Sequence, residues 1–241
     1  MRLLVFQHIA IEHPAIFRDF MAADGVSWDA VELDEGEPIP ALDGYDALMV
    51  MGGPMDVWQE DEHPWLIPEK AAVREAVARR AMPYLGFCLG HQLLGEALGG
   101  RGGPMAAPEI GVLDVELTLA GAADRLFAGA GATIKSLQWH GAEVCEAPPG
   151  SAVLASSPVC PVQALRVGER AWGIQFHCEV TAETVPEWGR VPAYREALEA
   201  ALGAGAQAGF EAEVARALPD FNQSARRLYD NFMAVVRSLA A

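Results

Sequence analysis

The chain of 241 residues carries 33 acidic and 17 basic side chains, a formal net charge of −16, and 51% of its residues are hydrophobic. This length and apolar fraction suffice for a full core, so they favour one α/β domain and argue against a disordered chain. The negative charge repels phosphate backbones and anionic lipid surfaces, which argues against nucleic acid and membranes as partners.

No apolar run reaches the roughly 20 residues of a membrane span, and the N-terminus has no small-residue cleavage site of a signal peptide. We therefore expect a cytoplasmic protein. The cysteines are scattered and form no C-x-x-C pair, so we expect free thiols and neither a metal site nor a cofactor. They are Cys88, Cys145, Cys160 and Cys178.

The first half of the chain alternates between short apolar runs and amphipathic segments. The apolar runs predict strands at 2–9, 27–33, 45–53 and 82–87. The amphipathic segments predict helices at 15–25, 68–81 and 89–100, with Pro68 in the first turn of the second. This alternation predicts an α/β fold, a three-layer open sheet that is mostly parallel and covered by helices on both faces.

From about residue 111 the pattern changes to short strands without long helices between them. We expect added antiparallel strands at 111–119, 132–140, 152–157, 161–168 and 170–180. The remaining pattern is helical again, with Gly and Pro separating helices at 193–202, 210–218 and 224–239. These helices should pack back on the core.

Cys88 lies between the strand at 82–87 and the helix at 89–100, with Gly86 two residues before it and Gly90 two after. This G-x-C-x-G pattern is the thiol counterpart of the G-x-S-x-G elbow, in which glycines allow a sharp turn and a close backbone approach. A thiol there lies at a helix N-terminus, which favours the thiolate, and above the carboxyl ends of the strands. Such a nucleophile still needs a base.

His91 is near Cys88 in sequence, but its side chain lies one helical turn further on, so we expect a structural histidine. His177 and Glu179 offer a better pair, because residues two apart in an extended segment share one face while Cys178 faces the other way. A carboxylate beside an imidazole fixes its tautomer and stabilises the imidazolium. Together with the elbow, this H-x-E pattern predicts a Cys-His-Glu triad.

At this point the chain resembles the class I glutamine amidotransferases, in particular free-standing members related to the glutaminase part of GMP synthase, with a flavodoxin-like fold. The resemblance covers roughly residues 1–185 and implies hydrolysis of a side-chain amide through a cysteine thioester. The matching pieces are MGGP (51–54), GFCLGHQ (86–92), PEIG (108–111), QWHG (138–141) and QFHCE (175–179).

The resemblance also implies a role for each matching residue. Cys88 would attack the amide of glutamine, His177 would act as general acid and base, and Glu179 would orient it. Backbone N–H groups of Gly53 and Leu89 would form the oxyanion hole. The substrate-binding positions would be Gly52, Gln92 and the loop Gln138, Trp139 and His140.

Several of these residues also have structural interpretations. The pair Gly52 and Gly53 is compatible with a simple turn, Trp139 with a core position or pocket wall, and His140 with a hydrogen-bonded structural histidine. We expect solvated loop positions for His8, His13 and His63, and inert apolar positions for Cys145 and Cys160.

The chain departs from the family pattern at Cys178, where a proline is common. Cysteine leaves the local backbone looser than proline does and restores an N–H donor. The triad side chains are unchanged, so we expect activity to persist.

We expect one amidotransferase-like domain, with a catalytic core at 1–185 and a helical extension at 186–241. No phosphate loop or nucleotide motif follows the core, so ammonia would pass to a separate synthase, or hydrolysis would itself be the task. Three hypotheses stay open: the glutaminase component of an amidotransferase, a γ-glutamyl hydrolase or peptidase, and a non-catalytic binding protein. The loop at 55–69 is a candidate cover for the site.

Overall fold

The computed structural model describes residues 1–240 and the side chains of residues 1–239. One nine-stranded sheet runs through it in the order β2-β1-β3-β4-β9-β8-β7-β5-β6. The first five strands of this order are parallel, and the pairs from β9 to β6 are antiparallel. The predicted α/β class and flavodoxin-like sheet are therefore confirmed.

The parallel half consists of five short strands. They are β1 (Arg2–Gln7), β2 (Ser27–Glu32), β3 (Ala47–Val50), β4 (Tyr84–Phe87) and β9 (Ala171–Ile174). Within β1, Leu3 and Val5 pack into one apolar cluster while Leu4 and Phe6 pack into the other. A strand that is apolar on both faces must be covered on both faces, which explains why these runs are continuously hydrophobic.

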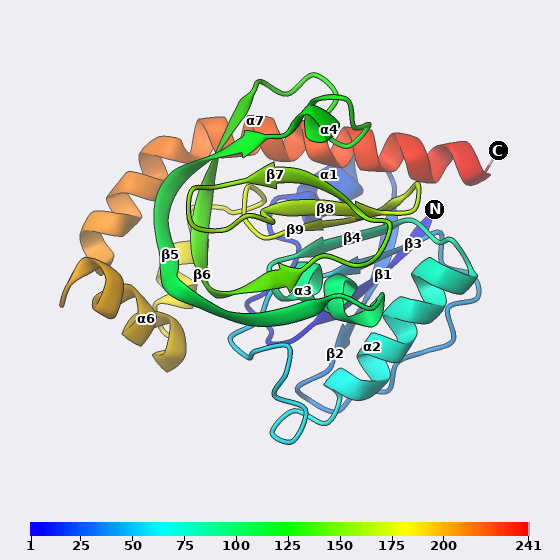
Figure 1. Ribbon diagram of the computed structural model, residues 1–241, viewed down its shortest axis with the longest axis horizontal. Helices are drawn as coiled ribbons and strands as arrows, with labels where there is room; N and C mark the ends of the chain where they lie inside the picture. The colour runs from blue at the N-terminus through cyan, green and yellow to red at the C-terminus, as the bar shows by residue number, and fades with distance from the viewer. Residues whose placement is uncertain (241) are drawn as a thin grey trace.

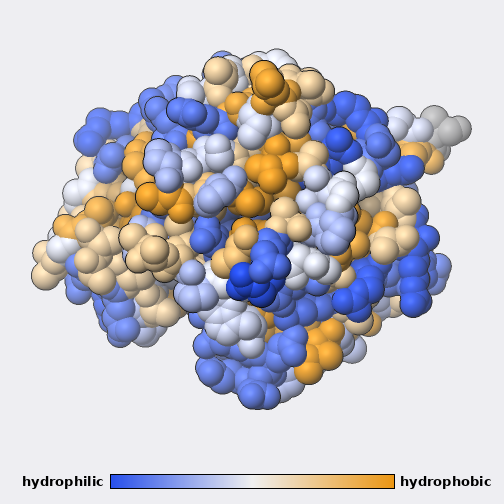
Figure 2. Space-filling model, viewed as in Figure 1, coloured by the Kyte–Doolittle hydropathy of each residue, from blue (hydrophilic) through white to orange (hydrophobic). Residues whose placement is uncertain are grey.

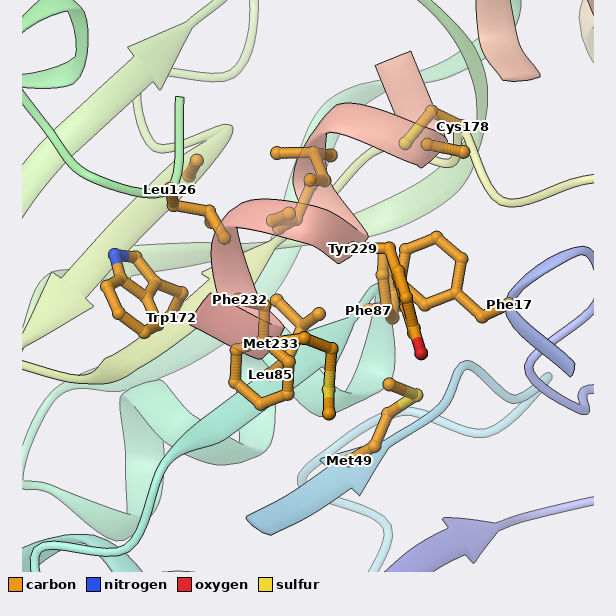
Figure 3. Packing of buried hydrophobic residues seen from close by; sticks show 14 of the residues in the cluster. Phe17, Met49, Leu85, Phe87, Leu126, Trp172, Cys178, Tyr229, Phe232 and Met233 are labelled. Atoms are coloured by element: carbon orange, nitrogen blue, oxygen red, sulfur yellow. The ribbon is translucent and has the colours of Figure 1, made fainter. Parts of the chain in front are cut away.

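Helices cover the two faces of the sheet. One face packs against α1 (Phe17–Ala23) and α7 (Gln207–Ala240). The other packs against α2 (Leu66–Arg74) and α3 (Leu89–Ala97). Figure 3 shows the first of these layers, where the rings of Phe17 and Tyr229 meet edge to face with centroids 5.6 Å apart.

The antiparallel half is dominated by a long hairpin of β5 (Arg101–Leu117) and β6 (Thr133–Glu146), which arches across the front of Figure 1. The short strands β7 (Ala152–Ser156) and β8 (Ala164–Val167) connect it to β9. The strand predicted at 111–119 thus begins ten residues earlier, at Arg101. Its register shifts between Pro104 and Glu109, so the pairing is interrupted where sequence patterns showed no strand.

The C-terminal part contains α5 (Thr184–Trp188), α6 (Pro192–Leu202) and α7, which runs along the upper edge of the view in Figure 1. The helices predicted at 210–218 and 224–239 form a single helix, α7, which continues through Pro219. Phe221, Leu228 and Phe232 of α7 are all buried, so packing along the helix offsets the backbone hydrogen bond that a proline cannot make.

The remaining elements are short. A π-helix, η1 (Glu75–Arg79), continues α2, and α4 (Leu119–Ala122) follows β5 with Thr118 as its N-cap. Within the described residues no helix is at once long and apolar enough to cross a membrane.

Candidate active site

Three adjacent parallel strands direct their carboxyl ends to one edge of the sheet, and each is followed by residues predicted for the site. Gly52 and Gly53 follow β3, Cys88 follows β4, and His177 and Glu179 follow β9. Open α/β sheets bind their ligands at this edge. The structure therefore brings the predicted residues together from three distant segments of the chain.

Cys88 occupies the sharp turn that its flanking glycines predict. Its backbone has φ 48° and ψ −103°, a conformation that costs a non-glycine residue about 1–3 kcal/mol. A Cβ on Gly86 would lie 2.5 Å from the carbonyl oxygen of Gly90, and one on Gly90 would overlap the carbonyl oxygen of Val50. Only glycine fits either place, and the turn presents the thiol at the N-terminus of α3.

His177 lies between Cys88 and Glu179. Its Nδ1 is 2.6 Å from Oε1 of Glu179, and Cys88 lies near enough to the imidazole to influence its charge. Burial alone would lower the pKa of His177, but the Glu179 carboxylate and then Cys88 raise it well above its usual value. The three side chains thus lie in the order expected of a nucleophile, a base and an orienting carboxylate.

The segment that carries His177 is not part of a strand, because β9 ends at Ile174 and His177 forms one isolated bridge with Leu137. The expected alternation still holds. Cys178 is completely buried in the apolar cluster with Phe17 and Tyr229, away from Glu179. Its backbone N–H donates to Oε2 of Glu179 over 3.0 Å, so the donor that a proline would lack here holds the second oxygen of the carboxylate.

Two residues predicted to supply backbone N–H groups share the cavity with the thiol. Gly53 and Leu89 both line the cavity at Cys88. Among the described residues, neither N–H donates a hydrogen bond to another protein group. Unpaired N–H donors near a nucleophile are available to stabilise a developing oxyanion.

The cavity beside Cys88 has an empty volume of about 590 Å³, including its open mouth. Gln92, Trp139 and His140 line it as predicted. Gly52 and Gln138 do not, and the segment with Gln138 is part of β6 and not a loop. The Gln138 side chain instead donates to Gln163, and its Oε1 lies 3.0 Å from Nε2 of the His140 ring.

Gln92 has a second role that its motif did not indicate. Its amide donates to Oε1 of Gln175 over 3.1 Å, and Gln175 in turn lies 3.5 Å from the sulfur of Cys88. Gln175 is completely buried. This short chain of amides places a hydrogen-bond donor against the thiol from a residue that does not line the cavity.

Sequence reasoning missed a carboxylate and a tyrosine at the site. Glu12 is buried, and its Oε1 accepts a hydrogen bond of 2.5 Å from the hydroxyl of Tyr194 in α6. Burial raises the pKa of Glu12, against the opposing effect of nearby His177. Tyr194, Ala193 and Ala197 of α6 form one wall of the cavity. Only long-range packing joins these segments, so no local pattern could have found them.

The predictions for four other residues need correction. His8 is completely buried, not solvated, because it bonds to Glu69 and to the backbone of Gly52. His13 and His63 are half-buried. Cys145 is exposed, whereas Cys160 is buried as expected.

His91 is a structural histidine, as predicted, although its partner is distant in sequence. Its Nε2 is 3.1 Å from the carbonyl oxygen of Val162, and burial lowers its pKa to about 4. Within the described residues no group of three or more His, Cys, Asp or Glu side chains could hold a metal ion.

Comparison with known proteins identifies the family. The model of the class I glutamine amidotransferases matches residues 15–187. The chain belongs to this family. Among curated relatives of this amidotransferase, the glutamine amidotransferase-like protein YfeJ of Salmonella typhimurium is 36% identical over 163 residues, 66% of this chain and 67% of that protein.

Two further relatives of this class I amidotransferase have names that state a reaction. A glutamine-hydrolysing GMP synthase subunit of Sulfurisphaera tokodaii is 33% identical over 153 residues, 63% of this chain and 77% of that protein. γ-Glutamyl peptidase 3 of Arabidopsis thaliana is 26% identical over 179 residues, 71% of this chain and 70% of that protein.

The fold of this amidotransferase also matches a solved structure over nearly its whole length. A glutamine amidotransferase from Thermotoga maritima superposes with a TM-score of 0.85 and 26% identity, over 96% of this chain and 97% of that one. The match therefore includes the helices that follow residue 187, where the family model ends.

Proposed function

We propose that this protein hydrolyses the side-chain amide of glutamine through a γ-glutamyl thioester on Cys88. The observation that carries the proposal is the hydrogen-bonded pair His177 and Glu179 close to Cys88, which lines the same cavity as Gly53 and Leu89. Membership of an amidotransferase family supports the same chemistry.

In the first half of the reaction, Nε2 of His177 takes the thiol proton of Cys88 and the sulfur attacks the amide carbon. The N–H groups of Gly53 and Leu89 stabilise the negative oxygen of the tetrahedral intermediate. His177 then gives its proton to the leaving nitrogen, which departs as ammonia. Glu179 stabilises the imidazolium throughout.

In the second half, His177 removes a proton from a water molecule, whose oxygen attacks the thioester. Collapse of this intermediate releases glutamate and restores the Cys88 thiol. Gln92, Trp139 and His140 line the cavity in which the amino-acid part of the substrate would lie. Gly52 and Gln138 do not line this cavity, so neither is included among the proposed substrate contacts.

We propose that the ammonia passes to a separate synthase. The relatives named as subunits of GMP synthase support this proposal, since such a name implies a partner chain. We propose further that residues 1–185 and 186–241 act as one domain, because α6 contributes to the cavity wall and α7 packs on the sheet. The cytoplasmic location stays a prediction.

A second candidate is hydrolysis of other γ-glutamyl compounds. Ala193 and Ala197 of α6 line the cavity, and their small side chains leave space for a leaving group larger than ammonia. The similarity to γ-glutamyl peptidase 3 also favours this candidate. Both candidates use the same thioester, and they differ in the leaving group.

The test is a substrate panel with the purified protein. Released glutamate is followed with glutamine, γ-glutamyl dipeptides and γ-glutamyl alkylamides, in the wild type, in Cys88→Ala and in the matched control Cys145→Ser, whose thiol is exposed. If kcat/KM is highest for glutamine, the first candidate is supported. If kcat/KM is at least tenfold higher for dipeptides than for glutamine, the second is supported. Release of glutamate that persists in Cys88→Ala would contradict both.

A further inference from the structure

A completely buried pair, His8 and Glu69, lies directly against the turn that carries the free N–H of Gly53. Nδ1 of His8 is 2.7 Å from the carbonyl oxygen of Gly52, and Nε2 is 2.9 Å from Oε1 of Glu69. Both side chains have an exposed fraction of 0%. The stacked ring of Trp65, with its centroid 5.4 Å away, covers the imidazole.

Both ring nitrogens of His8 thus face oxygen atoms. A carbonyl oxygen only accepts, so Nδ1 must carry a proton, and the second nitrogen shares another proton with the carboxylate. Burial alone would lower the pKa of His8, but Glu69 and the Gly52 carbonyl outweigh it and raise the pKa. Glu69 therefore keeps Nδ1 in the state that donates to Gly52.

The bond from His8 to the Gly52 carbonyl also fixes the direction of the Gly53 N–H, which belongs to the same peptide unit. The peptide between Gly52 and Gly53 is planar and trans, so its C=O and N–H point in opposite directions. Fixing the oxygen against His8 fixes the N–H of Gly53 on the other side. Gly53 lines the cavity together with Cys88, and a Cβ on Gly53 would lie 2.9 Å from Cβ of His8.

We propose that His8, held by Glu69, is a positioning residue that keeps the Gly53 N–H directed at the reacting carbonyl oxygen. This proposal rests on the proposed function, since it assigns the Gly53 N–H to an oxyanion. His8 itself does not line the cavity, so it acts on the reaction only through the Gly52–Gly53 peptide.

Two substitutions of His8 separate its two bonds. In His8→Asn the amide nitrogen takes the place of Nδ1 and can still donate to Gly52. In His8→Gln the amide nitrogen takes the place of Nε2, so the contact with Glu69 survives and the bond to Gly52 is lost. Both variants replace a buried ring by a smaller polar group, which makes each the structural control of the other.

The expected result is a kcat for His8→Gln that is lower by about 10²-fold, with KM within about threefold of the wild type. His8→Asn should retain kcat within about tenfold. Equal losses in both variants, or a wild-type kcat in His8→Gln, would overturn the proposal. If neither variant folds, Glu69→Leu, which removes the partner of Nε2, provides the test: about tenfold lower kcat at unchanged KM supports it, and unchanged kcat overturns it.

A second readout does not depend on any substrate. In protein labelled with ¹⁵N-glycine, the amide resonance of Gly53 should shift or split into two in His8→Gln. In His8→Asn it should shift no more than the resonances of the other glycines do. If the wild type hydrolyses no γ-glutamyl compound, the proposed function fails, and the Gly53 resonance alone decides the positioning role. A resonance that is unchanged in His8→Gln overturns that role.

Discussion

His177 and Glu179 are joined by a hydrogen bond of 2.6 Å between Nδ1 and Oε1, and both side chains are almost completely buried. The bond leaves Nε2 of His177 for the thiol of Cys88. Since the N–H of Cys178 holds the other carboxylate oxygen, Glu179 has one orientation and His177 has one tautomer. This pair determines which nitrogen of His177 can exchange a proton with Cys88.

Glu179→Gln should lower kcat by about 10²–10⁴-fold. The amide oxygen will accept from the Cys178 N–H, so the NH₂ group will face Nδ1 of His177 and favour the tautomer that cannot accept the thiol proton. Steady-state kinetics with the best substrate of the panel will measure the loss. A variant with more than a tenth of the wild-type kcat would show that orientation by Glu179 is unimportant.

The pH dependence of kcat/KM follows from the raised pKa of His177. The imidazolium that protonates the leaving nitrogen stays available as pH rises through the usual value of 6.5 and is lost only above the raised pKa. The alkaline limb should therefore lie above pH 6.5 in the wild type and move to lower pH in Glu179→Gln. An alkaline limb at the same pH in both proteins would contradict this assignment.

Much of the site could be predicted from sequence because its key residues occur in short sequence patterns at the ends of strands. Gly86, Cys88 and Gly90 form one turn, and His177 and Glu179 are two residues apart. Glu12 and Tyr194 could not be found in this way, because 182 positions separate them and only the packing of α6 brings them together. The prediction that His8 is solvated is wrong, because its position in a loop gives no indication of its buried partner, Glu69.

The fold shows the same division. The parallel strands were recognisable as continuous apolar runs, whereas the first part of β5, with its glycines, prolines and alanines, forms a strand only because β6 pairs with it. Pro219 indicated a break in a helix, but tertiary packing of α7 decided otherwise.

Ala197→Phe tests whether α6 limits the size of the leaving group. Ala197 lines the cavity, so a phenylalanine there should raise KM for γ-glutamyl dipeptides at least tenfold and raise it less for glutamine. Ala200→Phe on the same helix is the control, because Ala200 is exposed. The alanine-rich surface of α6 is visible as the pale orange area at the left of Figure 2. Equal effects of the two variants would exclude α6 from substrate selection.

His91→Gln should reduce the acid sensitivity of the fold. His91 is neutral when buried and has a pKa of about 4, below its usual 6.5, so its contribution to stability is present above pH 6.5 and is lost as pH falls through 4. Each pKa unit corresponds to about 1.4 kcal/mol, so the wild type should lose up to about 3 kcal/mol more than the variant between pH 7 and 4.

Urea unfolding at several pH values measures this difference. The glutamine amide can still donate to the carbonyl of Val162. The wild type and the variant therefore differ in the titrating group and not in this hydrogen bond. Parallel stability curves for the two proteins would show that His91 is not the group responsible.

The most direct test of the central claim is covalent labelling with a chloroketone analogue of glutamine, followed by peptide mass spectrometry. The reagent carries the γ-glutamyl skeleton and captures the nucleophile that attacks it. We predict one label per chain, on Cys88, with protection by glutamine or the preferred γ-glutamyl compound and no labelling of Cys88→Ala. Labelling of another residue in the wild type, or undiminished labelling of Cys88→Ala, would contradict the account.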